Sequence, residues 1–465
     1  MNYHLLPFTF TRISNHEVLV NELGDMIISP NGTVSCLVNR EPIDEELFKS
    51  LAANFFVSET AIPALSDIYA LRLREKKRFI DQFTALHIFV LTLRCNQNCI
   101  YCQASSCNED CSTVTMSMHT MKKSVELMFK SPSPHLTMEF QGGEPSLEPG
   151  LLRYGIELAE EINKTEQREI NYVLCTNCVD LTDEVMEICK QYKVLISSSL
   201  DGPAFLHNTN RGKKDSYEKV VAGFERARGI LGEDQVSALM TTSELALDFP
   251  CEIVDEYLRL GFNSIFLRAL NPYGLATDNP DWSIYTDRFI EFYKKALEHI
   301  IDLNKQGTLF IEEFAAIILK KMITPFTAGF VDLQSPAGII NSVLVYNYDG
   351  WVYASDESRM LAEFNDYTFR LGHVDEPYEN IVYGKAAKSA AKYWANEALA
   401  GCSDCGVRAF CGADPVRNHS TQNDLYGYRP TSLLCRKNKA IIEYIISLII
   451  ERYDEVMPIF KSWLI

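Results

Sequence analysis

The sequence lacks three features that would place it in well-defined classes of protein. It has no long basic run, and its 44 Lys and Arg residues stand against 62 Asp and Glu, a net charge of -18. A surface that binds nucleic-acid phosphates is therefore not expected. It also shows no internal repeat and no low-complexity segment, which argues against a solenoid or a disordered chain. With 47% hydrophobic residues over 465 positions, it is expected to form two or three domains with substantial cores.

Signals for membranes and export are also missing. The most apolar stretch, residues 440–450, is short and interrupted by Glu443, so no transmembrane span is expected. Residues 1–10 lack the basic segment and apolar core of a secretory signal, and we therefore expect a cytoplasmic protein. In that compartment, 14 cysteines indicate metal ligation or redox chemistry more than disulfides.

From residue 86 the sequence alternates short apolar runs with amphipathic segments, which is typical of βα units around a parallel sheet. The runs are too apolar for a sheet with one solvated face. The expected strands are residues 88–94, 136–141, 171–176, 194–200, 235–241 and 264–269, and helices are expected over 217–231 and 252–260. The pattern predicts an α/β fold, a partial (β/α)6 barrel over residues 83–305.

The segments on either side of this barrel show a different pattern of expected strands and helices. Within residues 1–82, strands at 18–20 and 26–29 and a helix at 43–55 predict a small α+β domain. Within residues 306–465, a helix at 312–322 precedes a strand pair at 342–348 and 351–353 that turns at Asp349-Gly350. A second group of cysteines follows this pair.

The strongest chemical signal is Cys95, Cys99 and Cys102, spaced C-x3-C-x2-C directly after the first barrel strand. Three thiolates in one loop can bind three irons of a 4Fe-4S cube and leave the fourth iron open for chemistry. The residues between them, Asn96 to Asn98, are polar, so three chance core cysteines are a poor explanation. A zinc site is the better competitor, with Cys107 as a fourth ligand.

Together with Gln141-Gly142-Gly143-Glu144-Pro145 after the second strand, this motif resembles the radical S-adenosylmethionine (SAM) enzymes. In that family, SAM chelates the open iron through its amino and carboxylate groups. One-electron reduction of the cluster then cleaves SAM to a 5′-deoxyadenosyl radical, which abstracts a substrate hydrogen. The resemblance favours iron over zinc and implies both a 4Fe-4S cluster and SAM as cofactors.

The resemblance also suggests which residues contact SAM. Residues 197–203, with His207 and Arg211 after them, look like the fourth-strand stretch of peptide-modifying members. Two glycines at the end of a parallel strand let the backbone approach a ligand closely, whatever the family. The alternative for Arg211 is a surface side chain whose charge contacts no ligand. The expected cofactor-binding residues are Gln141, Gly142, Gly143, Glu144, Ser199 and Arg211.

A second group, Cys402, Cys405, Cys411 and Cys435, could saturate a 4Fe-4S cube, and a four-cysteine zinc ribbon is the alternative. This segment resembles the SPASM extension of radical SAM peptide maturases, which carries seven cysteines and usually two auxiliary clusters. The three absent cysteines all belong to one of those clusters, and this chain has Ser335, Ser355 and Pro415 in the corresponding stretches. One auxiliary 4Fe-4S cluster is therefore expected, with serine ligation at Ser335 or Ser355 left open.

The other cysteines carry weaker signals. Cys175 and Cys178 form a C-x2-C where the family usually has Thr-Asn-Gly, and we interpret them as core or loop residues. The same interpretation applies to the isolated residues Cys36, Cys189 and Cys251. The roles of Cys107 and Cys111 stay open, and the sequence singles out no catalytic residue beyond those that would hold cofactors.

The whole chain resembles the B-type radical SAM maturase of the His-Xaa-Ser system, through residues 3–8, 19–22, 411–415 and 429–432. That resemblance implies a ribosomally made precursor peptide as substrate. It also implies a second radical SAM maturase, a small accessory protein, and an electron donor such as flavodoxin or ferredoxin. Residues 1–82 look faintly like a winged-helix precursor-recognition domain, with a purely packing role as the alternative.

The predicted reaction is an oxidative crosslink between precursor side chains, because related maturases form such bonds and an auxiliary cluster can accept an electron. Epimerisation is one alternative and would need a hydrogen donor, for which Cys107, Cys111 and Cys251 are candidates. Anaerobic sulfatase-type maturation is a second alternative. A third is a non-enzymatic iron-sulfur scaffold that binds peptide or passes electrons.

Overall fold

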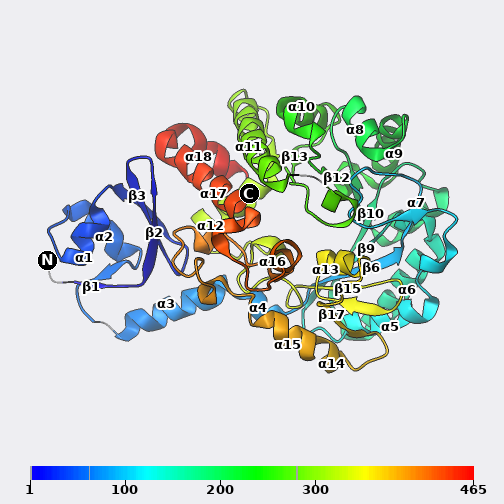
Figure 1. Ribbon diagram of the computed structural model, residues 1–465, viewed down its shortest axis with the longest axis horizontal. Coiled ribbons are helices and arrows are strands. Elements are labelled where there is room, and N and C mark those ends of the chain that lie inside the picture. The colour runs from blue at the N-terminus through cyan, green and yellow to red at the C-terminus, as the bar shows by residue number, and fades with distance from the viewer. Residues whose placement is uncertain (1–2, 62, 279–280, 465) are drawn as a thin grey trace.

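The computed structural model describes residues 3–61, 63–278 and 281–464, and an eight-stranded mixed sheet lies in its right-hand half in Figure 1. The strand order is β12-β11-β10-β9-β6-β15-β16-β17. Neighbours from β12 to β15 are parallel, and the last two pairs are antiparallel. The strands of this sheet are β6 (Leu86–Thr92), β9 (His135–Gly142), β10 (Glu169–Thr176), β11 (Leu195–Ser199), β12 (Val236–Leu239), β15 (Val343–Tyr346), β16 (Trp351–Tyr353) and β17 (Arg370–His373).

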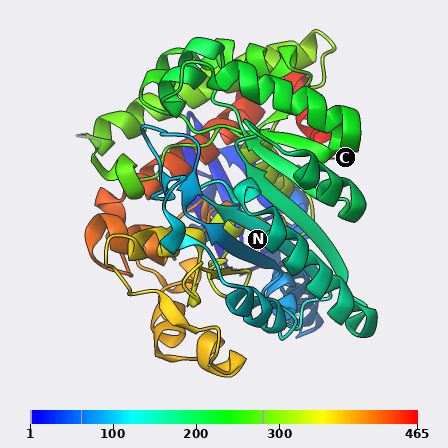
Figure 2. The ribbon, with the colours of Figure 1, turned by 90° about the vertical axis from the view of Figure 1, so that its right-hand side faces the viewer.

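The predicted fold class is confirmed, because five of the expected strands form the parallel part of this sheet with helices between them. Helices α5, α6, α7 and α9 follow successive strands and contact one another along its outer face (Figures 1 and 2). Their bounds are α5 (Met118–Met128), α6 (Pro149–Glu166), α7 (Asp183–Tyr192), α8 (Ala204–Arg211) and α9 (Ser216–Leu231). The carboxyl ends of β6, β9, β10 and β11 therefore meet at one edge, where ligand sites of such folds form.

The sixth expected strand, residues 264–269, differs from the prediction. Only β13 (Ser264–Ile265) is regular, and it pairs with β14 (Ile311–Glu312) instead of the main sheet. A single bridge between Thr242 and Ala269 continues the barrel order. The reason is local: the backbone N–H of Leu267 donates to the Glu312 carboxylate at 3.1 Å, so a side chain takes the place of a strand partner.

The C-terminal segment extends the barrel sheet, which the sequence does not indicate. Strand β15 lies parallel to β6, and β16 returns through the predicted turn, where Gly350 has a φ of 86°. Side chains of both parts, including Ile88, Val90 and Val345, share one hydrophobic cluster. The predicted barrel and the predicted C-terminal unit thus share a sheet and a core.

The N-terminal segment forms its own lobe, drawn in blue in Figure 1. Strands β2 (Phe8–Ile13), β3 (His16–Asn21) and β4 (Met26–Pro30) make an antiparallel sheet, covered by α1 (Thr33–Asn39) and α2 (Glu45–Ala53). A small separate core that includes Leu19, Leu37 and Phe48 holds this lobe together. The short strands β1 (His4–Leu5) and β5 (Val57–Ser58) pair with each other, and α3 (Pro63–Lys76) leads towards the barrel.

The remaining helices surround the second cysteine group or close the far end of the barrel. Helix α17 packs against α11 and α18, and the predicted apolar stretch at 440–450 lies in α17 with Ile441, Ile445 and Ile449 buried. None of the helices that the structure describes is both long and apolar enough to span a membrane. The helices and short strands not yet given are α4 (Phe79–Gln82), α10 (Pro250–Arg259), α11 (Trp282–Lys305), α12 (Glu313–Ile323), α13 (Asp356–Ala362), α14 (Tyr378–Val382), α15 (Lys385–Ala391), α16 (Pro415–Gln422), α17 (Leu433–Glu451), α18 (Tyr453–Ser462), β7 (Arg94–Cys95) and β8 (Cys107–Asn108).

Candidate functional site

A cavity of about 520 Å³ lies at the carboxyl ends of the parallel strands. The loop after β6, the Gly-Gly turn after β9 and the end of β11 form one side of it. The segment around α13 and residues of α17 form another side. A volume of this size suits a small-molecule cofactor together with part of a substrate.

The three cysteines of the first motif all line this cavity. Cys95, Cys99 and Cys102 are half-buried and form no disulfide. Burial raises the pKa of Cys95 to about 12, and the charges of Glu144 and the other two thiols raise it further. Burial also raises the pKa of Cys99, so these two thiols would bind as thiolates only around a strongly positive centre, and an iron-sulfur cluster supplies one.

Cys107, the fourth ligand of the alternative zinc site, lies outside this cavity. It belongs to β8, which pairs with β7. Burial raises the pKa of its thiol to about 11, and a hydrogen bond with Cys111 adds to the rise, so this thiol is engaged elsewhere. In the described parts of the chain, no three or more His, Cys, Asp and Glu side chains are arranged for a single metal ion.

A buried ion pair fastens the cysteine loop. The Arg211 guanidinium donates to both oxygens of Asp201 at 2.8 and 3.0 Å, and Tyr101 donates to the same carboxylate at 2.7 Å. The third nitrogen of Arg211 lies 3.7 Å from the Cys99 sulfur. Arg211 is only 7% exposed, so the alternative of an ordinary surface charge is wrong. Burial by itself would raise the pKa of Asp201, but the Arg211 and His207 charges and the hydrogen bonds from Arg211 and Tyr101 together outweigh it, and the net shift is downward.

The Gly-Gly turn brings β9 against the start of the cysteine loop. The N–H of Gly143 donates to the Thr92 carbonyl at 2.8 Å, and that of Glu144 donates to the Arg94 carbonyl at 2.7 Å. A Cβ at Gly143 would lie 2.3 Å from the Arg94 carbonyl oxygen, and Gly142 has a φ of 146°. Both positions therefore require glycine.

Among the expected SAM contacts, Gln141, Gly142, Gly143, Ser199 and Arg211 line the cavity. Glu144 is not among the described residues that line it.

The Glu144 side chain is 1% exposed and accepts hydrogen bonds from Ser146 N–H, Thr176 Oγ1–H and Asn177 N–H. Because its carboxylate is fully used inside the protein, Glu144 shapes the loops and does not face the ligand space.

Sequence reasoning missed a charged wall on the C-terminal side of the cavity. Burial and the neighbouring carboxylates raise the pKa of Glu357 to about 8, while burial raises that of Asp414 to about 6. Burial lowers the pKa of Lys437 to about 8. No motif spacing could have revealed the group, because its members come from separate segments. They are Arg268, Asp332, Asp356, Glu357, Asp414, Arg417 and Lys437.

The cysteines outside the two groups differ in where they lie. Cys178 and Cys189 are buried, as expected for core residues. Cys175 instead lines the cavity, where burial raises the pKa of its thiol well above the usual range and the Glu139 carboxylate adds to the effect. Cys36, Cys111 and Cys251 are not among the described residues that line it.

The structure brings the four cysteines of the second group into one neighbourhood. Burial raises the pKa of Cys402 to about 11; Arg429 lowers it, and the thiols of Cys411, Cys435 and Cys405 raise it further. All four thiols are half-buried and form no disulfide. Three come from the loop before α16 and one from the first turn of α17. Four soft thiol donors in one neighbourhood suit the separate irons of a saturated 4Fe-4S cluster, whereas as placed they are not arranged around a single ion such as zinc.

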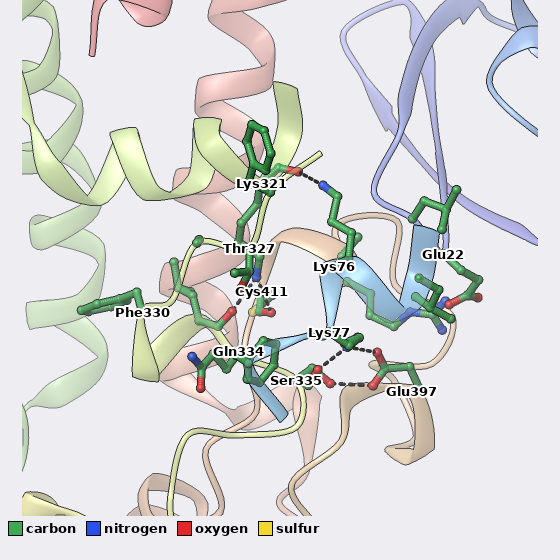
Figure 3. A pocket seen from close by; sticks show the side chains of 18 of the residues that line it. Glu22, Lys76, Lys77, Lys321, Thr327, Phe330, Gln334, Ser335, Glu397 and Cys411 are labelled. Atoms are coloured by element: carbon green, nitrogen blue, oxygen red, sulfur yellow. Dashed lines mark hydrogen bonds and ion pairs between the residues drawn. The ribbon is translucent and has the colours of Figure 1, made fainter. Parts of the chain in front are cut away.

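The two serines that replace expected cysteines both serve hydrogen bonds within the protein. Ser335 Oγ–H donates to Glu397 at 2.5 Å and its oxygen accepts from Asn396 N–H, while Lys77 pairs with Glu397 at 2.8 Å (Figure 3). Ser355 Oγ accepts from Ser358 N–H and caps α13. Either serine would have to give up these bonds to ligate iron.

Comparison with known proteins agrees with this geometry. Residues 89–244 match the profile of the Radical SAM superfamily. These residues form a radical SAM domain. Membership implies a 4Fe-4S cluster and SAM, and the three cavity thiols, two cavity glycines and the Arg211 guanidinium described above provide suitable donors for both.

The radical SAM cyclopropyl synthase TigE of Paramaledivibacter caminithermalis is 26% identical over 370 residues, 68% of this chain and 75% of that protein. The structure of native anSMEcpe with bound AdoMet superposes with a TM-score of 0.63 at 18% identity, covering 80% of this chain and all of that one. Streptococcus suis SuiB bound to S-adenosylmethionine gives a TM-score of 0.55 at 11% identity, covering 92% and 98%. At these identities the two structures show that the fold of the radical SAM domain and its extensions is shared.

Replacing Gly143 with Ala tests the contact between the glycine turn and the cysteine loop. Because the new Cβ would meet the Arg94 carbonyl at 2.3 Å, the loop must move. We expect SAM cleavage to fall about 100-fold, as for a displacement of about 1 Å in a reacting site. Gly150→Ala is the matched control, since nothing lies within 4 Å of its Cβ. Wild-type 5′-deoxyadenosine formation by Gly143→Ala would contradict this role.

Proposed function

We propose that this protein is a radical SAM maturase that modifies a ribosomally synthesised precursor peptide and forms an intramolecular side-chain crosslink. The observation that carries the proposal is the single cavity shared by the three motif thiols, the glycine turn and the charged wall. Its volume of about 520 Å³ leaves room for peptide side chains beside a cofactor. The SuiB structure bound to its precursor peptide SuiA supports a peptide substrate.

In this proposal Cys95, Cys99 and Cys102 hold the SAM-binding 4Fe-4S cluster. When bound, the cluster and SAM supply a 5′-deoxyadenosyl radical that takes a hydrogen atom from the substrate. Arg211 is held by Asp201 and keeps its remaining N–H group beside Cys99, where its charge offsets that of the thiolates. Backbone groups around Gly142 and Gly143, with the Gln141 and Ser199 side chains, bound the space for SAM.

Formation of a crosslink determines how many electrons and protons the substrate must lose. The substrate loses one hydrogen atom to the 5′-deoxyadenosyl radical, and it loses one further electron and one proton as the new bond closes. The Asp414 carboxylate, with a pKa of about 6, lines the cavity and is ionised at neutral pH, so it can accept that proton. Cys402, Cys405, Cys411 and Cys435 hold an auxiliary 4Fe-4S cluster, which would supply an electron acceptor when bound.

The alternative reactions require different residues at the cavity. An epimerase needs a hydrogen donor beside the substrate, and none of the thiols expected for that role, Cys107, Cys111 and Cys251, lines the described cavity. Cys175 does line it and is the thiol through which an epimerase would act. Similarity to a cysteine-type anaerobic sulfatase-maturating enzyme of Clostridium perfringens, 26% over 162 residues, keeps that reaction as a second candidate.

The cofactors are tested by anaerobic reconstitution. We expect about eight irons per chain, and 5′-deoxyadenosine formation after addition of SAM and dithionite. The triple variant Cys95→Ala/Cys99→Ala/Cys102→Ala should keep about four irons and form no nucleoside, while Cys402→Ala/Cys405→Ala/Cys411→Ala/Cys435→Ala should also keep about four. A wild-type protein that binds SAM but never cleaves it, with peptide present, would instead support the scaffold alternative.

The reaction is tested with a synthetic peptide that contains His-Xaa-Ser repeats, analysed by accurate mass and fragmentation. A crosslink removes two hydrogens per event and suppresses backbone fragments between the joined residues. A formylglycine made from serine also loses two hydrogens, but it keeps those fragments and reacts with a hydrazide. Unchanged mass in ordinary water combined with deuterium uptake in heavy water would make the protein an epimerase and would exclude the crosslink.

The N-terminal lobe, residues 1–82, is proposed to bind the precursor at a sheet edge. The β2 side of its sheet already lies against α17, where Thr11 donates to Glu443 at 3.0 Å. Strand β4 has no neighbour on its outer side among the described strands. An extended peptide can add to such an edge through main-chain hydrogen bonds.

The resemblance further predicts a second maturase, a small accessory protein, and flavodoxin or ferredoxin as partners.

Deleting residues 1–60 while keeping α3 tests this role. Because β4 supplies main-chain donors and acceptors for the peptide, we expect the affinity for the His-Xaa-Ser peptide to fall at least about tenfold. Nucleoside formation without peptide is the control and should fall less than the affinity; it also reports any damage to the main core, in which Ile13, Val18 and Val20 of the lobe pack. Unchanged peptide affinity, measured by fluorescence anisotropy, would leave the lobe a packing role only.

A further inference from the structure

Cys411 differs from the other cysteines of its group in the donors that surround it. The Asn438 Nδ2 group lies 3.8 Å from its sulfur, and the Lys321 ammonium donates to its carbonyl oxygen at 3.2 Å. Lys321 also donates to the Leu333 carbonyl, and the Lys76 ammonium donates to the Lys321 carbonyl at 3.1 Å (Figure 3). Side-chain donors from α12 and α17 thus reach this one cysteine, and Lys76 of α3 in turn binds the backbone of Lys321.

Asn438 also stands at the wall of the main cavity. It lines that cavity together with Leu434, Lys437 and Ile441, which lie on the same face of α17. Leu434 is the chain neighbour of Cys435, so the wall and a second auxiliary cysteine are joined covalently. A single helix therefore separates the substrate space from the second cysteine group.

The orientation of the Asn438 amide follows from the chemistry of its neighbour. A metal-bound thiolate can only accept a hydrogen bond, so the NH2 group must face Cys411. The side chain is 3% exposed, and its Oδ1 has no hydrogen-bond partner among the described residues. Burying an amide whose carbonyl oxygen has no hydrogen-bond partner costs free energy. The hydrogen bond that its NH2 group donates must offset that cost.

We propose that Asn438 and Lys321 are positioning residues that hold Cys411 and raise the reduction potential of the auxiliary cluster. This rests on the proposed function, in which Cys411 is a ligand of that cluster. The Asn438 N–H group directed at the ligand sulfur stabilises the additional negative charge of the reduced cluster, and Lys321 fixes the backbone that carries that sulfur. A higher potential makes the centre a better acceptor for the electron that the crosslink releases.

The experiment isolates the auxiliary centre in the Cys95→Ala/Cys99→Ala/Cys102→Ala background. Midpoint potentials are measured by redox titration followed by electron paramagnetic resonance. Asn438→Leu and Lys321→Met should each move the midpoint to more negative values, and Asn438→Asp should move it further because it adds a carboxylate. Tyr444→Phe is the control on the same helix; its hydroxyl donates to Glu298, outside the cysteine group, and its midpoint should not move.

A second readout detects the hydrogen bond itself. In heavy water, the reduced centre should show a coupled exchangeable deuteron in pulsed resonance spectra, and Asn438→Leu should lose that coupling. Midpoints equal to that of the control, with iron content retained, would overturn the proposal.

Loss of iron is also informative. If Asn438→Leu binds no iron while the conservative variant Asn438→Gln does, the amide is needed to hold Cys411, which supports the positioning role. If neither variant binds iron while Tyr444→Phe does, the potential cannot be set by the amide alone and the Lys321→Met midpoint decides. A background protein without iron would overturn the auxiliary cluster, and the inference with it.

Discussion

Asp201, just after β11, and Arg211, at the end of α8, form a buried ion pair that holds the cysteine loop. Removing two charges from water is expensive, so such a pair persists only with good geometry and further hydrogen bonds. Tyr101 supplies one of those bonds from within the cysteine loop, and the backbone carbonyl of Arg211 accepts from Asn98 N–H at 3.3 Å. The ion pair therefore sets the position of the loop that carries Cys99 relative to the barrel.

A close backbone contact completes the arrangement from the other side. Gly143 lets β9 approach the carbonyls of Thr92 and Arg94, and Glu144 ties the same turn to Thr176 and Asn177 after β10. The two constraints act on opposite ends of the cysteine loop. Together they hold a flexible, polar loop in one conformation while leaving its thiols facing the cavity.

The C-terminal segment completes the cavity and carries the second cysteine group. Its strand β15 joins β6, which places the acidic residues of α13 opposite the cysteine loop. Near Ser335, Lys77 and Glu397 form an ion pair. This pair links the segment after α3 to the C-terminal segment.

Local sequence determined the features that depend on short-range order. Strands β9 to β12 follow from their apolar, β-branched runs, and the cysteine motif follows from a spacing that one loop can satisfy. Tertiary structure decided the rest, because the relevant partners are far apart in sequence. Arg211 is buried only because Asp201 and Tyr101 surround it, and Glu144 turns inward because Thr176 and Asn177 offer donors. Likewise, the charged wall brings Glu357 of α13 together with Arg268 of the barrel and Lys437 of α17, and that long-range arrangement has no local signature.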